Sequence, residues 1–250
     1  MTTISQIPKP EAGRFKSGRK LFLVPLFPLP YNTSTEGEKI VQKYWSQTTA
    51  QIGNLENQLG KINNIYHESI FENEEQAFNL IKSTNAKGEF FIRQLIERSA
   101  TLQISEDKNL VLENSDWQRC LTVGLISEKV FKRAMEGYQD SLNARYEYMA
   151  KKIDETLSEN QIGILFVRED HKIQFPNDIQ IFFIAPPGLD ELKKWLDKSM
   201  SQPLPNQDSK TEETAAAEPI IMGDKSMSQP LPNQDSKTEE TTDDEPIIMG

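Results

Sequence analysis

The chain contains very little cysteine and histidine. Its 250 residues include one cysteine, Cys120, and two histidines, His67 and His171. A single cysteine excludes an intramolecular disulfide and a cysteine-rich zinc site, and it fits a reducing compartment. Because Trp117 and Leu121 lie beside Cys120 in a helical pattern, we predict that Cys120 is a buried structural thiol.

Long apolar runs are also missing. No uninterrupted apolar stretch approaches the roughly 18 residues that a membrane span needs. The polar segment from Met1 to Lys20 lacks the apolar run of a signal peptide. We therefore expect no membrane partner and a cytoplasmic location.

Clustered positive charge is absent as well. The net charge is −10, but the last 54 residues hold twelve acidic residues against four lysines, so the first 196 residues carry only −2. Binding to a phosphate backbone needs clustered Lys and Arg. We therefore expect no nucleic-acid partner, and we assign most of the acidity to the end of the chain.

Several catalytic signatures do not occur. The sequence has no Gly-x-x-x-x-Gly-Lys-Ser/Thr loop, no Gly-x-Gly-x-x-Gly fingerprint, no Gly-x-Ser-x-Gly elbow and no His-Glu-x-x-His helix. Nucleotide-driven and serine-hydrolase chemistry thus lose their usual support.

A 27-residue unit, by contrast, occurs twice. Asp197–Gly223 and Asp224–Gly250 differ only where Ala215–Ala217 become Thr242–Asp244, so 27 minus 3 leaves 24 identical positions. Each copy closes on Glu-Pro-Ile-Ile-Met-Gly. The unit is too polar to offset the ordering entropy of roughly 1 to 2 kcal/mol per residue, so we predict a disordered acidic tail over residues 199–250.

The rest of the chain predicts one α/β domain over residues 20–198, after a flexible polar leader over residues 1–19. Apolar runs predict buried strands, and apolar residues spaced three and four apart predict amphipathic helices. The expected strands are 21–29, 162–167, 179–184 and, with ambiguity, 65–66; the expected helices are 35–60, 74–83, 87–99, one or two helices over 115–158, and 189–198. The first helix is expected to start with a capping box, Thr35 with Glu38. This order indicates a helix-rich domain with a small sheet packed against long helices.

The best candidate catalytic residues follow the strand 162–167. Arg168, Asp170 and His171 lie at its carboxyl end, where α/β sheets present ligand-binding groups. Asp170 would orient the imidazole of His171, and Arg168 would bind a carboxylate or phosphate. The other interpretation of this charged turn is a solvated surface or a salt-bridge network.

A metal site is a further alternative. His67 is followed by Glu68, and His171 is preceded by Asp170. If the fold brought these segments together, His67, Glu68 and His171 would suit one divalent cation such as zinc or manganese. If the two histidines are unrelated, no cofactor is expected.

One segment resembles a known family. Arg145-Tyr146-Glu147-Tyr148-Met149-Ala150-Lys151-Lys152-Ile153, followed by Gly163-Ile164-Leu165-Phe166-Val167 and His171, looks like the closing part of Tiki-like (TraB-type) domains. The resemblance implies a helix leading into a strand and a histidine-bearing turn, and in some members metal-dependent peptide cleavage. In that family the histidine usually follows a glycine-containing turn and works with a second histidine just after the first strand. Here Glu169-Asp170 occupies the turn, and Val24-Pro25-Leu26-Phe27 offers no histidine at the first strand. The resemblance therefore implies a degenerate site.

Two functions follow from these patterns. The first is a non-enzymatic or degenerate α/β domain whose tail displays two docking peptides for a protein partner, with Pro219, Ile220, Ile221 and Met222 and then Pro246, Ile247, Ile248 and Met249 as anchors. The second is a metal-dependent hydrolase or small-ligand-binding enzyme using His171. The sequence leaves open whether the chain is an enzyme and what its oligomeric state is; a neutral tail duplication is a further alternative.

Overall fold

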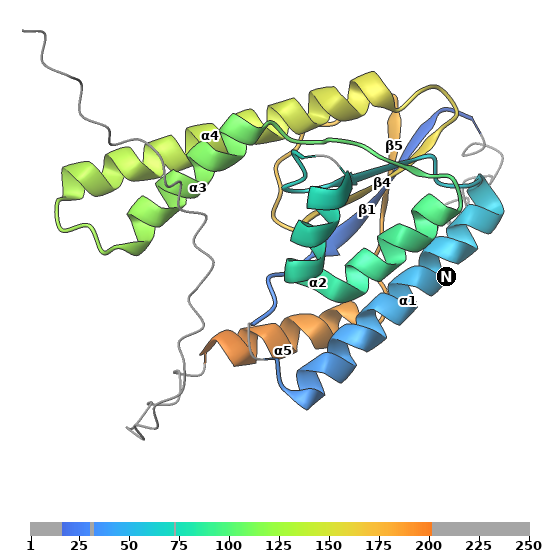
Figure 1. Ribbon diagram of the computed structural model, residues 1–250, viewed down its shortest axis with the longest axis horizontal. Coiled ribbons are helices and arrows are strands. Elements are labelled where there is room, and N and C mark those ends of the chain that lie inside the picture. The colour runs from blue at the N-terminus through green and yellow to red at the C-terminus, as the bar shows by residue number, and fades with distance from the viewer. Residues whose placement is uncertain (1–16, 31–32, 73, 202–250) are drawn as a thin grey trace, which may run out of the picture. The chain divides into compact units, whose positions relative to one another are not determined.

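The computed structural model describes residues 17–30, 33–72 and 74–201 (Figure 1). Five strands form one parallel sheet in the order β3-β2-β4-β1-β5. The strands are β1 (Arg19–Leu26), β2 (Asn64–His67), β3 (Thr101–Leu102), β4 (Ile162–Arg168) and β5 (Ile179–Phe183). The predicted α/β class, with a small sheet and long helices, is confirmed.

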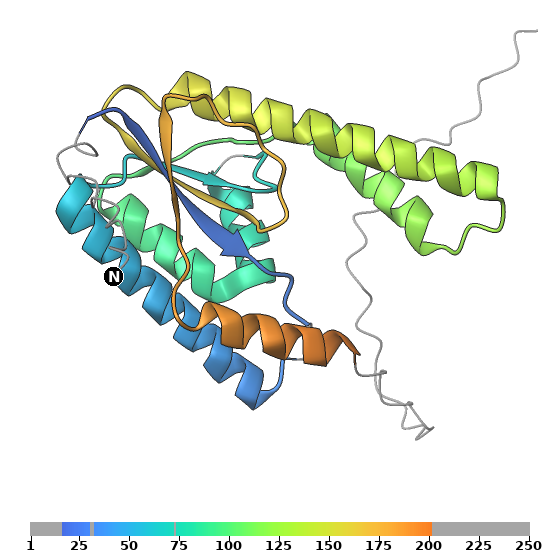
Figure 2. The ribbon, with the colours of Figure 1, turned by 180° about the vertical axis from the view of Figure 1, so that it is seen from behind.

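Five helices complete the described domain. They are α1 (Thr35–Leu59), α2 (Glu74–Glu97), α3 (Lys108–Thr122), α4 (Glu128–Thr156) and α5 (Leu189–Ser201). Helices α1, α2 and α5 cover one face of the sheet, and the second half of α4 covers the other, as the two opposite views show (Figures 1 and 2). None of the helices in these residues is both long and apolar enough to cross a lipid bilayer.

Strand β1 explains why the sheet needs two layers of helices. Its side chains alternate, so that Phe22 and Val24 pack toward α1 and α2 while Leu21 and Leu23 pack toward α4. All four are buried. An unbroken apolar run is what a parallel strand covered on both faces requires.

Three helix predictions need correction. The N-cap of α1 is Ser34, whose Oγ accepts a hydrogen bond from the Gly37 amide at 3.1 Å, in place of the predicted Thr35 capping box. The predicted helices 74–83 and 87–99 are one continuous helix, because Gly88 is tolerated within it. Helix α3 starts at Lys108, where the Asp107 carboxylate accepts from the Asn109 and Leu110 amides.

Helices α3 and α4 form a hairpin that extends past the sheet (Figures 1 and 2). We call α3, residues 123–127 and the first half of α4 (residues 128–142) the arm. The two helices approach closely where Gly137 faces the Trp117 indole, because a Cβ at position 137 would lie 2.4 Å from that ring. Cys120 lies on this arm and is exposed, so the predicted burial of its thiol is wrong.

The ends of the chain fall largely outside this description. Helix α5 continues to Ser201, three residues past the predicted end of the domain at Lys198. Of the predicted leader (residues 1–19), residues 1–16 lie outside the described residues and Arg19 already begins β1. Of the predicted tail (residues 199–250), residues 199–201 are part of α5, and residues 202–250, with both docking peptides, lie outside the described residues.

Candidate functional site

Charged side chains from four parts of the chain meet at the carboxyl ends of β2 and β4. Glu68 directly follows β2, Glu106 follows β3, Arg145 lies on α4, and Arg168 is the last residue of β4. We call these four residues the buried ion network. Parallel strands bring their carboxyl ends to one edge of the sheet, which is why residues far apart in sequence become neighbours here.

Arg168 is bound to Glu68. The Arg168 side chain donates from Nε to Glu68 Oε1, and the Arg168 amide donates to Glu68 Oε2, both at 2.9 Å. Arg168 also donates from Nη2 to the Tyr146 hydroxyl at 3.4 Å. Burial is the largest single influence on the pKa of Arg168 and would lower it. The charge of Glu68, together with Tyr146, Tyr138 and Asp170, outweighs burial, and the pKa is raised. Arg168 is thus a fixed cation whose carboxylate partner belongs to the protein.

Arg145 and Glu106 form the most buried ion pair. The Arg145 guanidinium donates to both Glu106 oxygens, at 2.7 and 2.5 Å, and to Asn114 Oδ1 at 2.9 Å. Only 7% of the Arg145 side chain and none of the Glu106 side chain is exposed. Such a bidentate pair fixes orientation as well as charge.

Hydrogen bonds extend the buried ion network into the arm. Asn114 of α3 donates to Ser141 Oγ at 3.0 Å and to the Tyr138 carbonyl at 3.2 Å, both on α4. On the sheet side, the Ser69 amide donates to Glu106 at 2.7 Å. The network therefore joins the base of the arm to the loops that follow β2 and β3.

The charges of the network balance. Two arginines face two glutamates, and Arg145 also lies 3.8 Å from Glu68. A buried ion pair with complete hydrogen bonding is close to neutral for stability, whereas removing one partner leaves an uncompensated charge that costs about 3 to 5 kcal/mol. The arrangement thus fixes one geometry for the base of the arm.

His67 lies beside this network in the core. Its Nδ1 is 2.6 Å from the Glu68 carbonyl, and its ring packs on Phe166 with 5.8 Å between centroids. Burial lowers the pKa of His67 to about 4, so the ring is neutral near pH 7. Its amide donates to Ser105 Oγ at 3.2 Å, which ties the end of β2 to the loop after β3.

His171 occupies a different environment. It is half-buried, packs edge-on against Phe175, and its Nδ1 accepts from the Ile173 amide at 3.3 Å. Burial lowers the pKa of His171, while the charges of Glu68 and Asp170 oppose that shift. Asp170 itself is exposed. Of the predicted catalytic residues, Arg168 is therefore hydrogen-bonded to Glu68. Asp170 lies at the surface, and its charge affects the pKa of His171.

The predicted metal ligands are held by other partners. Both oxygens of Glu68 accept from Arg168, and His67 Nδ1 contacts a backbone carbonyl. Within residues 17–30, 33–72 and 74–201, no group of three or more His, Cys, Asp and Glu side chains is arranged to hold a metal ion. The proposed set of His67, Glu68 and His171 finds no support in this geometry.

A shallow groove of about 380 Å³ lies next to the network, between α4 and the segment after His171. Its lining is mixed: Asn143, Tyr146, Glu147, Ala150, Lys172 and Gln174. Tyr146 connects the two features, because its ring borders the groove and its hydroxyl accepts from Arg168.

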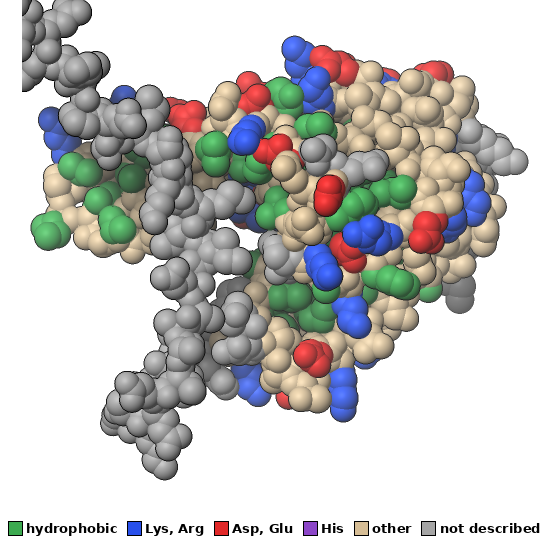
Figure 3. All heavy atoms as spheres, viewed as in Figure 1, with side chains coloured by type: hydrophobic (Ala, Val, Ile, Leu, Met, Phe, Trp, Pro, Cys, Tyr) green, Lys and Arg blue, Asp and Glu red, His purple; other side chains and the backbone are tan. Residues whose placement is uncertain are grey.

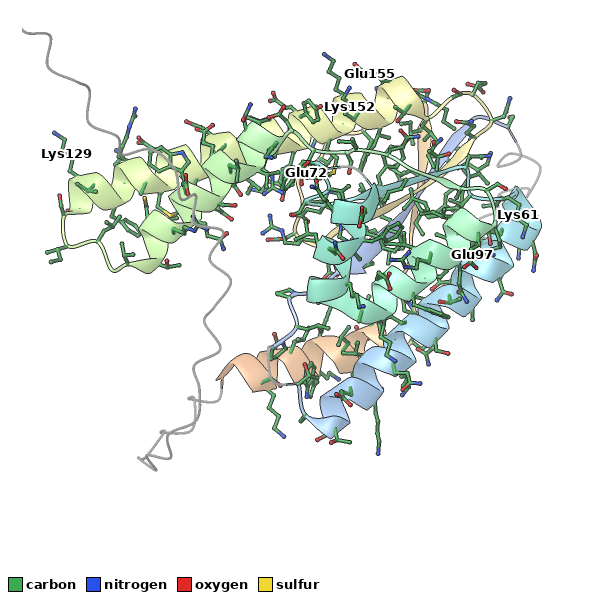
Figure 4. All side chains as sticks on the ribbon, in the orientation of Figure 1. Lys61, Glu72, Glu97, Lys129, Lys152 and Glu155 are labelled. Carbon is green, nitrogen blue, oxygen red and sulfur yellow. The ribbon has the colours of Figure 1, made fainter. Side chains whose placement is uncertain are left out.

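The far end of the arm presents a second candidate surface. Five large apolar residues there are exposed, from 43% for Met135 to full exposure for Ile126; the others are Val123, Val130 and Phe131. We call these five residues the apolar end of the arm. Hydrophobic side chains are visible there in Figure 3, and Lys129 points outward beside them in Figure 4.

The sequence did not point to Glu106, Asn114 or Arg145 as site residues. One signal in the sequence could have pointed to the network. Arg145 is a charged residue directly before the buried Tyr146, on a helix with an apolar face. Its partner Glu106 lies 39 residues earlier, next to a two-residue strand, so no local pattern connects the two.

Neither protein-family models, nor curated proteins, nor solved structures match this chain.

Proposed function

We propose that this chain is a non-enzymatic α/β domain that binds protein partners through its arm. The observation that carries the proposal is the combination of a base fixed by the buried ion network and an end with five exposed apolar residues. Exposed apolar patches of several hundred Å² on a folded domain commonly mark interaction surfaces. A rigid base lowers the entropy that an ordered docking element loses on binding.

The same network argues against catalysis at the predicted turn. The Glu68 carboxylate already binds Arg168, the cation that would bind a substrate anion. His67 is a buried neutral ring. We further propose that the likeness of the segment from Arg145 to His171 to Tiki-like domains reflects a degenerate member, since the end of β1, Val24–Leu26, and Phe27 after it include no histidine.

The repeated tail is proposed as a second means of attachment. Pro219–Met222 and Pro246–Met249 each supply an apolar anchor within an acidic spacer. Peptides of this kind bind by adding to a sheet edge or filling a groove, and a second copy raises avidity through effective concentration. We assign this role to the cytoplasm, where a chain with one cysteine remains reduced.

Cross-linked capture tests the proposal. Four proteins would be compared: the full chain, the chain ending at Lys198, the chain lacking only Asp224–Gly250, and the full chain with Phe131→Ser. We expect partner recovery to fall for Phe131→Ser and in two steps for the tail deletions. Phe90→Ser is the matched control, because Phe90 is an exposed phenylalanine on α2. Equal recovery from all five proteins would end the proposal.

The groove beside Tyr146 favours a second candidate, a small-ligand-binding protein. Lys172 and Tyr146 would bind an anion. A ligand that binds only the folded state at 100 times its Kd stabilises it by about 2.7 kcal/mol. Thermal unfolding with inorganic phosphate, acetate, Zn²⁺ or Mn²⁺, in the full chain and in Lys172→Ala, tests this candidate. An unchanged Tm with all four probes would remove it.

A further inference from the structure

One apolar stripe runs along the whole of α4, but only half of it is covered. Phe131, Met135, Leu142, Tyr146, Met149 and Ile153 recur at helical spacing. Tyr146, Met149 and Ile153 are at most 5% exposed because they pack on β1, β4 and Tyr66. Phe131 and Met135 are 46% and 43% exposed, since this part of α4 extends past the sheet.

Helix α3 does not cover the exposed half of this stripe. It packs on a different side of α4, through Trp117 against Gly137 and Asn114 against Ser141, close to the buried Ala134. A two-helix hairpin therefore leaves Phe131 and Met135 partly exposed, at 46% and 43%, on a helix face that α3 does not fully cover. Another helix, or another hairpin, has the shape that fits such a face.

We propose that a second copy of this chain covers the apolar end of the arm, so that two arms pack as a four-helix bundle. This inference rests on the proposed function, because it names the partner that the arm binds. A twofold axis makes the same patch serve on both copies. The arm projects beyond the rest of the domain in both views, so two arm ends can meet without contact between the sheets and their covering helices (Figures 1 and 2).

The charges of the arm suit pairing with itself. Residues 108–142 contain five acidic and five basic side chains, so the arm has no net charge that would repel an identical arm. Along residues 128–142 of α4, the acidic Glu128, Glu136 and Asp140 are mixed with the basic Lys129, Lys132 and Arg133, so neither sign of charge dominates. A surface selective for a strongly acidic or basic partner would carry one sign of charge.

The available area sets the expected strength. A standard interface buries about 800 Å² on each partner, and the five apolar side chains together expose on the order of several hundred Å². The polar sides of the helices supply the remainder. We therefore expect a reversible dimer whose population depends on protein concentration.

Sedimentation of the full chain over a range of concentrations tests the pairing. The full chain should pass from monomer to dimer, and Phe131→Ser with Met135→Ser should raise the dimer Kd at least about tenfold, as loss of central apolar anchors does. Phe90→Ser on α2 should leave the Kd unchanged. Both exchanges are at exposed positions, so unchanged circular dichroism would show that the variants fold.

Cys120 supplies a second measurement. As the chain's one cysteine, exposed on α3 near the apolar end of the arm, it takes a spin label at a single site. Dipolar coupling between two labels should appear with the dimer and disappear in the Phe131→Ser, Met135→Ser variant. A monomer at all concentrations, or a dimer that keeps its Kd in this variant, would overturn the inference. A dimer lost on removal of residues 199–250 but kept in the arm variant would assign association to the tail instead.

These outcomes separate the inference from the proposed function. If the arm variant loses captured proteins while the full chain stays monomeric, the arm binds a different protein, and only the second-copy inference fails. If neither capture nor association responds to the arm variant, the arm's part in the proposed function fails as well.

Discussion

The two halves of α4 carry the same apolar pattern and have opposite fates. From Tyr146 to Ile153 the stripe is buried against the sheet, while Phe131 and Met135, on the same stripe, are exposed on the arm. Sequence periodicity reports that a helix has an apolar face, and it says nothing about what covers that face. The buried half contributes to folding, and the exposed half is available for binding.

The boundary between the halves coincides with the buried ion network. Arg145 directly precedes Tyr146, where the buried half of the stripe begins. Its guanidinium donates hydrogen bonds to Glu106 and Asn114. The network therefore joins the arm to the loops at the carboxyl edge of the sheet. This division predicts that substitutions at the boundary and in the buried half cost far more stability than substitutions on the arm.

The largest effect is expected at the boundary. Arg145→Ala leaves Glu106 buried without its cation, which should lower the free energy of unfolding by about 3 to 5 kcal/mol. Arg133→Ala is the control, because the Arg133 side chain is 81% exposed and lies 3.6 Å from the nearby Glu136. Urea unfolding measures both. A loss in Arg145→Ala no greater than in Arg133→Ala would show that the network does not fix the arm.

Paired methionines compare the two halves directly. Met149 is fully buried and Met135 is 43% exposed. Met149→Ala should destabilise by about 2 to 5 kcal/mol through lost burial and a cavity. Met135→Ala should stay within about 0.5 kcal/mol. If Met135→Ala costs as much as Met149→Ala in urea unfolding at concentrations where the chain is monomeric, the exposed half is packed within the monomer.

Strands β1, β4 and β5 and the two longest helices, α1 and α4, could be predicted from the sequence because their signals are local. The apolar runs at 21–26 and 162–167 identify central strands, and the spacing of Val41, Trp45 and Ile52 identifies α1. Strand β3 is only two residues long, and the start of α3 is marked by Asp107 rather than by an apolar repeat. Short elements of this kind carry too few residues to show a period.

The site could not be predicted in the same way. The prediction at Arg168 found one residue of the network, because it depended on the general placement of loops at the carboxyl ends of strands. Its partner Glu68 lies 100 residues earlier, and it was assigned to a metal site for its neighbour His67. The prediction that Cys120 is buried is wrong for the same reason. A helical pattern predicts burial only where the helix packs on the core, and α3 extends past the core.

The buried His67 ring lies on the sheet side of the network and predicts that the stability of the fold depends on pH. Its pKa falls from 6.5 to about 4 on folding, so the unfolded chain binds more protons between these values. The contribution of the neutral His67 ring to the free energy of unfolding is fully present above pH 6.5. It is lost as the pH falls toward 4, by up to about 3 kcal/mol. In His67→Gln this part of the decline should vanish, whereas in His171→Gln most of it should remain. Identical pH profiles for the wild type and His67→Gln would refute the assignment.

The smallest effects compare the two ends of the arm. At the anchored end, the Asp107 carboxylate caps α3, directly after Glu106 of the buried ion network. At the free end, Ser127 is the N-cap of α4 but makes no side-chain hydrogen bond to its first turn. Asp107→Ala should therefore cost about 1 kcal/mol, and Ser127→Ala should stay within about 0.5 kcal/mol. Amide hydrogen exchange in α3 and in the first turns of α4 would locate each change. A loss of protection in Ser127→Ala that spreads from residue 128 to Arg145 would mean that the free end, rather than the network, holds the arm in place.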